Sequence, residues 1–137
     1  VGDGPMKEGL MKMTGGVSDL HFVGYREDIP DLIAALDIML IPSLNDGFNL
    51  AAVEAMASSI PIVAAAVGGL PEVVGEGGIL VESADTERMS QEAVTLLNSS
   101  RLRKEMGAKG RKRVETLFDW NACLRRTIDL YHQVVSN

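Results

Sequence analysis

One segment of the sequence combines residue types that suit both hydroxyl groups and a phosphate. Residues 41–57 read IPSLNDGFNLAAVEAMA, which is a buried strand, a polar turn and then a strongly helical stretch. Gly47 allows the backbone of the turn to approach a ligand closely. The first free N–H groups of the helix, at Asn49, Leu50 and Ala51, lie where a helix carries roughly half a positive charge, and that end favours phosphate.

Two carboxylates flank this predicted anion site. Asp46 precedes the helix and Glu54 lies about one turn inside it. Carboxylates accept hydrogen bonds from hydroxyl groups such as those of a ribose or another sugar. The segment therefore indicates a sugar–pyrophosphate ligand. In the alternative interpretation, Asp46 only caps the helix and Glu54 is an exposed helical acid, and the loop by itself leaves both open.

Helical stretches alternate with apolar ones along the chain. We expect strands at 20–24, 38–42, 61–66 and 78–81. We expect helices at 5–14, after Asp28, and at 49–58, 70–74, 86–98 behind Asp85, 101–116 behind Ser100 and 120–135 behind Asp119. Apolar strands separated by helices predict an α/β fold with a doubly wound parallel sheet, whose ligands bind beyond the carboxyl ends of the strands.

Composition narrows the class of protein. The 137 residues are 46% hydrophobic and 23% charged, which fits one globular domain rather than a disordered chain. No apolar run approaches the roughly 20 residues of a membrane span. Cys123 is the single cysteine, and His21 and His132 lie far apart. We therefore expect no disulfide, no metal, no cofactor and a cytoplasmic location.

Charge is distributed unevenly. Residues 1–100 carry four basic and fifteen acidic side chains, whereas residues 101–137 carry nine basic and four acidic ones. The acidic main body argues against nucleic acid as a partner. The basic stretch Arg101–Arg113 could contact an anionic surface, but we expect it to be a solvated helical face.

The run PSLNDGFNLAAVEAMASSIPIVAAAVGGLPEVV resembles the nucleotide-sugar-binding half of retaining glycosyltransferases of the GT-B fold, in particular glycosyltransferase family 4. That family has a Pro-Ser loop, two acids separated by seven residues, Glu-Ala-Met-Ala and a Gly-Gly-x-Pro-Glu turn. Further similarities follow in order at Val1–Pro5, Phe22–Gly24, Ala35–Ser43, Gly78–Val81, Phe118–Trp120 and Tyr131. The resemblance covers practically the whole chain and implies a Rossmann-like sheet, the C-terminal half of a GT-B fold lacking its first strand.

The resemblance also implies roles for individual residues. Glu54 would accept hydrogen bonds from the ribose hydroxyls, and Asp46 would face the donor sugar. These two are the predicted catalytic residues. The predicted substrate-binding residues are Gly47 and Phe48 at the sugar, Asn49, Leu50 and Ala51 at the phosphates, Tyr25 and Arg26 (with Asp28 beside them) at the nucleobase, and Ser43 in the Pro-Ser loop.

The sequence departs from the family pattern at three places. Asp46 stands where the family has Glu, and Asn49 stands where it has Gly. The third departure is the family's first strand, with its Gly-Arg…Lys-Gly segment, which we expect to lie outside this sequence together with the N-terminal acceptor-binding domain. We therefore expect residues 20–24 to pair directly with residues 38–42 in a four-stranded sheet, and the isolated chain not to transfer sugar.

Three functional classes remain open at this point. The first is the donor-binding domain of a transferase in polysaccharide or glycolipid synthesis, with peripheral membrane contact through the rest of the enzyme. The second is a non-catalytic nucleotide-binding or interaction module of the same fold. The third is a related GT-B enzyme such as a glycogen synthase or a sugar-nucleotide epimerase.

Overall fold

The computed structural model describes residues 2–135. Contacts within the chain divide it into two compact units, residues 1–32 and residues 33–137. The second unit contains the strands and most of the helices, and it carries the predicted site loop. Within residues 2–135, no helix is both long enough and apolar enough to cross a membrane.

The second unit is built on a parallel sheet with the strand order β1-β2-β3. Met39 pairs with Ile62, and Val63 pairs with Ile79. The strands are β1 (Met39–Ile41), β2 (Ile62–Ala65) and β3 (Ile79–Val81). The helices are α3 (Leu50–Ala57), α4 (Leu70–Val74), the 3-10 helix η1 (Gly75–Gly77), α5 (Thr86–Leu97), α6 (Ser100–Leu117) and α7 (Trp120–Val135).

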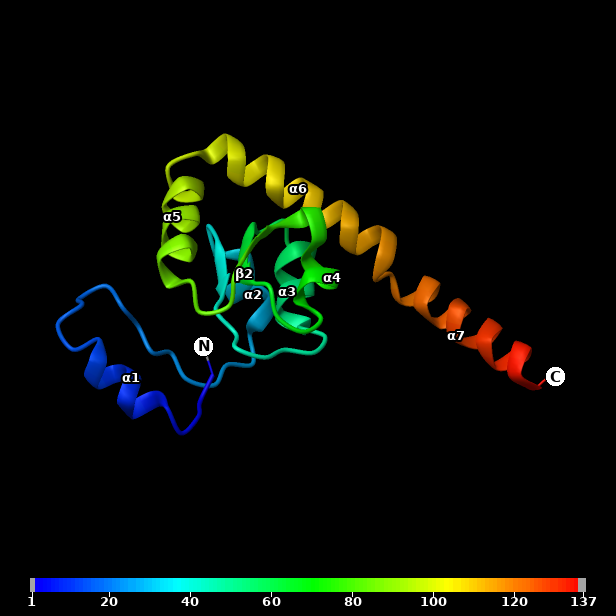
Figure 1. The fold of residues 1–137 in the computed structure, drawn as a ribbon, viewed down its shortest axis with the longest axis horizontal. Helices are drawn as coiled ribbons and strands as arrows, with labels where there is room; N and C mark the ends of the chain where they lie inside the picture. The colour runs from blue at the N-terminus through cyan, green and yellow to red at the C-terminus, as the bar shows by residue number, and fades with distance from the viewer. Residues whose placement is uncertain (1, 136–137) are drawn as a thin grey trace. The chain divides into compact units, whose positions relative to one another are not determined.

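The core of this unit surrounds the central strand β2, all of whose residues are buried. On one face, Val63 and Ala65 pack with Met89 and Leu96 of α5. Helices α3 and α4 lie on the other side of the sheet from α5 (Figure 1). Both faces of β2 are thus covered, which agrees with its continuously apolar sequence, as in a buried parallel sheet. The predicted doubly wound, Rossmann-like α/β fold is confirmed.

The predicted helices and the last three strands are found within about two residues of their expected ends. Asp85 caps α5 by accepting from Arg88 N–H at 2.8 Å, as predicted. The cap of α6 is Ser99, one residue before the expected Ser100, and it accepts from Leu102 N–H at 3.3 Å.

The first unit contains α1 (Lys7–Met13), and α2 (Ile29–Ala34) spans the boundary between the units. The strand predicted at 20–24 is wrong, and so is its pairing with residues 38–42. The sheet has three strands instead of four. Leu20, Phe22 and Val23 are 37–45% exposed, and Gly24 accepts one backbone hydrogen bond, from Gly2 N–H at 2.7 Å. An apolar segment becomes a strand only where a neighbouring strand supplies a ladder of bonds, and one bond is not a ladder.

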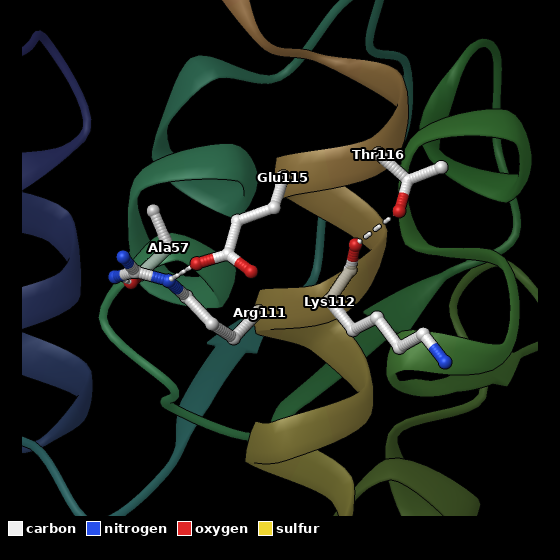
Figure 2. Close-up of polar contacts among 5 residues, drawn as sticks. All are labelled: Ala57, Arg111, Lys112, Glu115 and Thr116. Atoms are coloured by element: carbon white, nitrogen blue, oxygen red, sulfur yellow. Dashed lines mark hydrogen bonds and ion pairs between the residues drawn. The ribbon is translucent and has the colours of Figure 1, made fainter.

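Three arginines of α6 bind carbonyl groups at the carboxyl ends of other helices. The bonds run from Arg103 to Leu96 (2.9 Å) and Leu97 (2.6 Å), from Arg111 to Ala57, and from Arg113 to Glu72 (2.6 Å) and Val73 (3.0 Å). Figure 2 shows Arg111 between Ala57 at the end of α3 and Glu115 one turn further along α6. A cation stabilises the negative end of a helix. The predicted solvated face is therefore wrong for Arg103 and Arg113, which are partly buried, whereas Arg111 stays exposed while it binds Ala57. All three attach α6 to its neighbours.

Candidate functional site

The loop between β1 and α3 is organised around the carboxylate of Asp46. Its Oδ2 atom accepts hydrogen bonds from the Ser43 hydroxyl at 3.0 Å and from the Asn49 side-chain amide at 2.6 Å. Asn49 in turn caps α3, because its Oδ1 atom accepts from Ala52 N–H at 2.7 Å. All three polar side chains are partly buried. The cap of α3 is therefore Asn49, and Asp46 orients this residue instead of capping the helix itself.

Several polar groups of the same loop stay available for a ligand. The second carboxylate oxygen of Asp46, Oδ1, has no hydrogen-bond partner within residues 2–135. The backbone N–H groups of Asn49, Leu50 and Ala51 likewise have no acceptor in the described part of the chain. They lie at the positive end of α3, where a helix leaves its first N–H groups unsatisfied. The site thus offers one free acceptor and three free donors side by side along the chain.

Glu54 and Gly47 complete the predicted contact surface. Glu54 is exposed on α3, and its carboxylate forms no bond or ion pair with another residue of the described chain. Gly47 is exposed as well, and a Cβ atom added there would meet nothing within 4 Å. The packing of the fold therefore does not require glycine at position 47, and the space beside the backbone of this residue is open.

A pair of glycines supports the loop from the neighbouring strand end. Gly69 N–H donates to the carbonyl oxygen of Asp46 at 3.1 Å. Gly68 has a φ of +52°, and a Cβ atom there would overlap the Asp46 carbonyl oxygen. A Cβ atom on Gly69 would overlap the Gly47 carbonyl oxygen. The turn at residues 68–72 is thus a tight turn that brings two backbones together, and α4 begins there with Pro71 in its first turn.

Phe118 also contacts the loop, and sequence reasoning did not select it for the site. Its ring meets the ring of Phe48 edge to face, with centroids 5.4 Å apart and an interplanar angle of 76°. A shallow pocket of about 200 Å³ lies beside this pair. It is lined by Gly47, Phe48, Gly69, Glu72, Val73 and Phe118. No local sequence signal links residues 48 and 118, because they are 70 positions apart.

Tyr25 and Arg26 belong to the first compact unit, and their predicted place beside the nucleobase stays a prediction. The Arg26 guanidinium binds the Asp28 carboxylate with two hydrogen bonds, one of them Nε to Oδ1 at 2.7 Å. This pairing lowers the pKa of Asp28 and raises the pKa of Arg26. The carboxylate of Asp28 is thus bound to Arg26, and α2 begins at the next residue, Ile29. The ring of Tyr25 is exposed, and its backbone N–H donates to Asp3 at 3.2 Å.

The described residues contain no candidate metal site. Among residues 2–135, no three His, Cys, Asp or Glu side chains lie close enough together to hold a metal ion.

Residues 1–99 match the family described as "Glycosyl transferases group 1". The chain belongs to this family. A relative from Mycolicibacterium hassiacum, named MMP alpha-(1->4)-mannosyltransferase, is 37% identical over 130 residues. The match covers 93% of this chain and 30% of that relative.

Solved structures of other proteins have the same architecture as this group 1 glycosyl transferase chain. Sucrose-phosphate synthase from Thermosynechococcus elongatus superposes with a TM-score of 0.86 at 31% identity, covering 96% of this chain and 34% of that one. A protein from Anabaena, solved in complex with UDP-glucose, has a TM-score of 0.83 at 24% identity, with coverages of 93% and 36%. The chain thus has the Rossmann-like fold of a carboxyl-terminal GT-B domain, and it spans about a third of the length of these relatives.

Proposed function

We propose that this chain is the donor-binding domain of a retaining glycosyltransferase of family 4, and that it binds a nucleoside-diphosphate sugar. The observation that carries the proposal is the bonded set Ser43–Asp46–Asn49 at the amino end of α3. These bonds fix the position of the free Asp46 carboxylate oxygen relative to the free N–H groups at the start of α3. Membership of the group 1 glycosyl transferases supports the same interpretation.

Each part of the ligand has a counterpart in the loop. The free N–H groups of Asn49, Leu50 and Ala51 would bind the pyrophosphate. The unpaired Oδ1 atom of Asp46 would accept a hydrogen bond from a hydroxyl of the donor sugar, because its Oδ2 atom is already bonded within the loop. Glu54, exposed and unpaired within the described residues, would accept from the ribose hydroxyls.

The chemical contribution of such a domain is positional and electrostatic. When the sugar leaves the donor, negative charge develops on the pyrophosphate, and the positive end of α3 would stabilise it. Retention requires the acceptor to approach from the face that the pyrophosphate leaves. We infer that the acceptor and the remaining cationic groups come from other parts of a longer enzyme. Holding two reactants together is worth several powers of ten in rate, so this chain by itself would not transfer sugar.

Two further points belong to the same proposal. The reaction would need no metal ion, because the helix end and side chains of the enzyme would neutralise the leaving group. The enzyme would act in the cytoplasm on a polysaccharide or glycolipid acceptor.

The test is a comparison of nucleotides with their sugar conjugates. UDP, UDP-glucose, GDP and GDP-mannose would be titrated into the chain by calorimetry. A transferase donor site should bind one sugar conjugate more tightly than its parent nucleotide, because Asp46 contributes only when a sugar is present. Equal affinity for nucleotide and conjugate would favour the alternative, a non-catalytic nucleotide-binding module. No binding of any of the four would contradict both.

A further inference from the structure

We propose that Phe118, which lies at the end of α6, is a positioning residue for the donor loop and acts through the ring of Phe48. The inference rests on the proposed function, since it concerns the same nucleotide-sugar site. According to this proposal, Phe118 contributes to the affinity for the donor although it lies 70 positions after Phe48 in the sequence.

The first observation is the weak attachment of Phe48 to the rest of its surroundings. Phe48 lies between Asp46 and Asn49 in the loop, yet its side chain is 56% exposed. Its aromatic contact is the edge-to-face pair with Phe118, with ring centroids 5.4 Å apart. The backbone at position 48 is therefore held from this direction by a ring that the loop itself does not supply.

The second observation is that the loop is held on another side by a different element. Gly69 N–H binds the Asp46 carbonyl at 3.1 Å, and the absence of a Cβ atom at positions 68 and 69 allows this close approach. The pocket of about 200 Å³ is lined both by Gly69 and by the Phe48–Phe118 pair. Gly47 lies between the two contacts, with open space where its side chain would be. Two contacts from outside the loop thus flank Gly47, in addition to the Asp46–Asn49 bond within the loop.

The third observation is that Phe118 has a firm base. It is the residue that ends α6, and its N–H donates to the Val114 carbonyl at 2.9 Å. Five residues earlier, Arg113 binds the carbonyls of Glu72 and Val73 in α4, the helix that begins directly after Gly69. Both supports of the loop are therefore connected through α4, so the distance between them is defined. A fixed distance is what allows Phe118 to set the position of Phe48.

The experiment is a double-mutant cycle on binding. The chain with Phe118→Ala, Phe48→Ala and both changes would be titrated with UDP-glucose and GDP-mannose, with UDP and GDP in parallel. We expect F118A to weaken binding of the sugar conjugate by roughly three- to tenfold, the range of one aromatic pair. In the F48A background, the additional effect of F118A should fall to about onefold, because Phe118 acts through Phe48.

Controls separate positioning from general destabilisation. Phe118→Leu retains a large apolar side chain, and we expect it to recover part of the affinity. Tyr131→Ala on α7 removes an exposed aromatic ring that has no aromatic contact among the described residues, and it should leave binding unchanged. Thermal unfolding of every variant would show whether the fold persists.

The outcomes are distinguishable. Equal effects of F118A with and without Phe48 would overturn the inference, and so would unchanged binding by a folded F118A variant. If the unchanged chain bound none of the four probes, the proposed function would fail, and the inference would fail with it.

Discussion

The side-chain amide of Asn49 donates to the carboxylate of Asp46 at 2.6 Å, so the residue that caps α3 is oriented by the acid three positions before it. Both residues differ from the pattern of glycosyltransferase family 4, which the sequence resembles and which has Gly and Glu at these two positions. One hydrogen bond links the two residues that depart from the pattern. A shorter acid that reaches less far is held by an amide that a glycine could not provide. We therefore expect substitutions at these positions to affect one another.

Replacement of Asn49 should separate its two roles. Asn49→Ala removes the cap and should lower the free energy of unfolding by about 1 kcal/mol, whereas Asn49→Gly should cost only a few tenths. Both variants release the Asp46 carboxylate, so both should weaken binding of the sugar conjugate. Urea unfolding and calorimetric titration measure the two effects. Binding that follows stability, with N49G close to the unchanged chain in both, would contradict a role for this bond in the site.

Glu54→Gln should weaken ligand binding without affecting the fold. The side chain is exposed and has no partner within the described residues, so the free energy of unfolding should change by less than about 0.5 kcal/mol. The amide accepts hydrogen bonds from ribose hydroxyls less strongly than the carboxylate does, and affinity should fall severalfold for nucleotide and conjugate alike.

Glu76→Gln is the matched control for this substitution. Glu76 is an exposed acid in η1, before β3, and it also has no partner within residues 2–135. E76Q should leave affinity unchanged. Equal affinities of E54Q and the unchanged chain would show that Glu54 is only an exposed helical acid.

Alanine substitutions at Gly47 and Gly68 should affect different properties: ligand binding at position 47 and stability at position 68. A Cβ atom at position 47 meets nothing within 4 Å, so G47A should fold normally and weaken binding by occupying the open space. At position 68, φ is +52° and the Cβ atom would overlap the Asp46 carbonyl, so G68A should destabilise the chain by about 1–3 kcal/mol. Circular dichroism during urea unfolding, combined with titration, would distinguish the two. A stable G68A variant would mean that the turn can move away from the loop.

The sequence predicted the parts of the fold that depend on local pattern. The apolar runs of β1, β2 and β3 and the caps Asp85 and Asp119 could be identified, because each signal lies within a few residues. Residues 20–24 have the same apolar character, but a strand also needs a partner, and pairing is not a local property. The strand prediction failed for that reason.

The same distinction applies to the candidate site. The polar loop and its helix end were predicted from residue types at close spacing. The contacts that hold the loop were not: Gly69 reaches Asp46 across 23 positions, and Phe118 reaches Phe48 across 70. The arginines of α6 illustrate the point as well, because a run of basic residues does not indicate which of them will meet a helix end.

Arg113→Met should destabilise the second unit more than loss of a surface ion pair does. The guanidinium binds two carbonyls at the end of α4, and one hydrogen bond from a charged group typically contributes about 1.5–3 kcal/mol, so we expect a loss in at least that range. Arg101→Met removes only the exposed pair with Glu105 and should cost at most about 1 kcal/mol. The difference would be measured by urea unfolding. Equal losses would show that Arg113 contributes as an ordinary surface charge.

The ion pair of Arg26 and Asp28 gives the first unit a dependence on acid pH. The guanidinium holds the pKa of the Asp28 carboxyl below its usual value, chiefly through the side-chain hydrogen bonds. A carboxyl whose pKa is lower in the folded state stabilises the fold above its unfolded-state pKa of about 3.9. It loses that contribution as the pH falls through the folded-state pKa. NMR titration of the Asp28 carboxyl carbon should therefore give a midpoint below that of an unpaired aspartate.

In Arg26→Gln the midpoint should rise towards the ordinary value, whereas Arg88→Gln, which removes a cation of α5, should leave it in place. An Asp28 midpoint that is the same with and without Arg26 would show that the pair does not persist in solution, and Arg26 would then be free for the nucleobase contact predicted from the sequence.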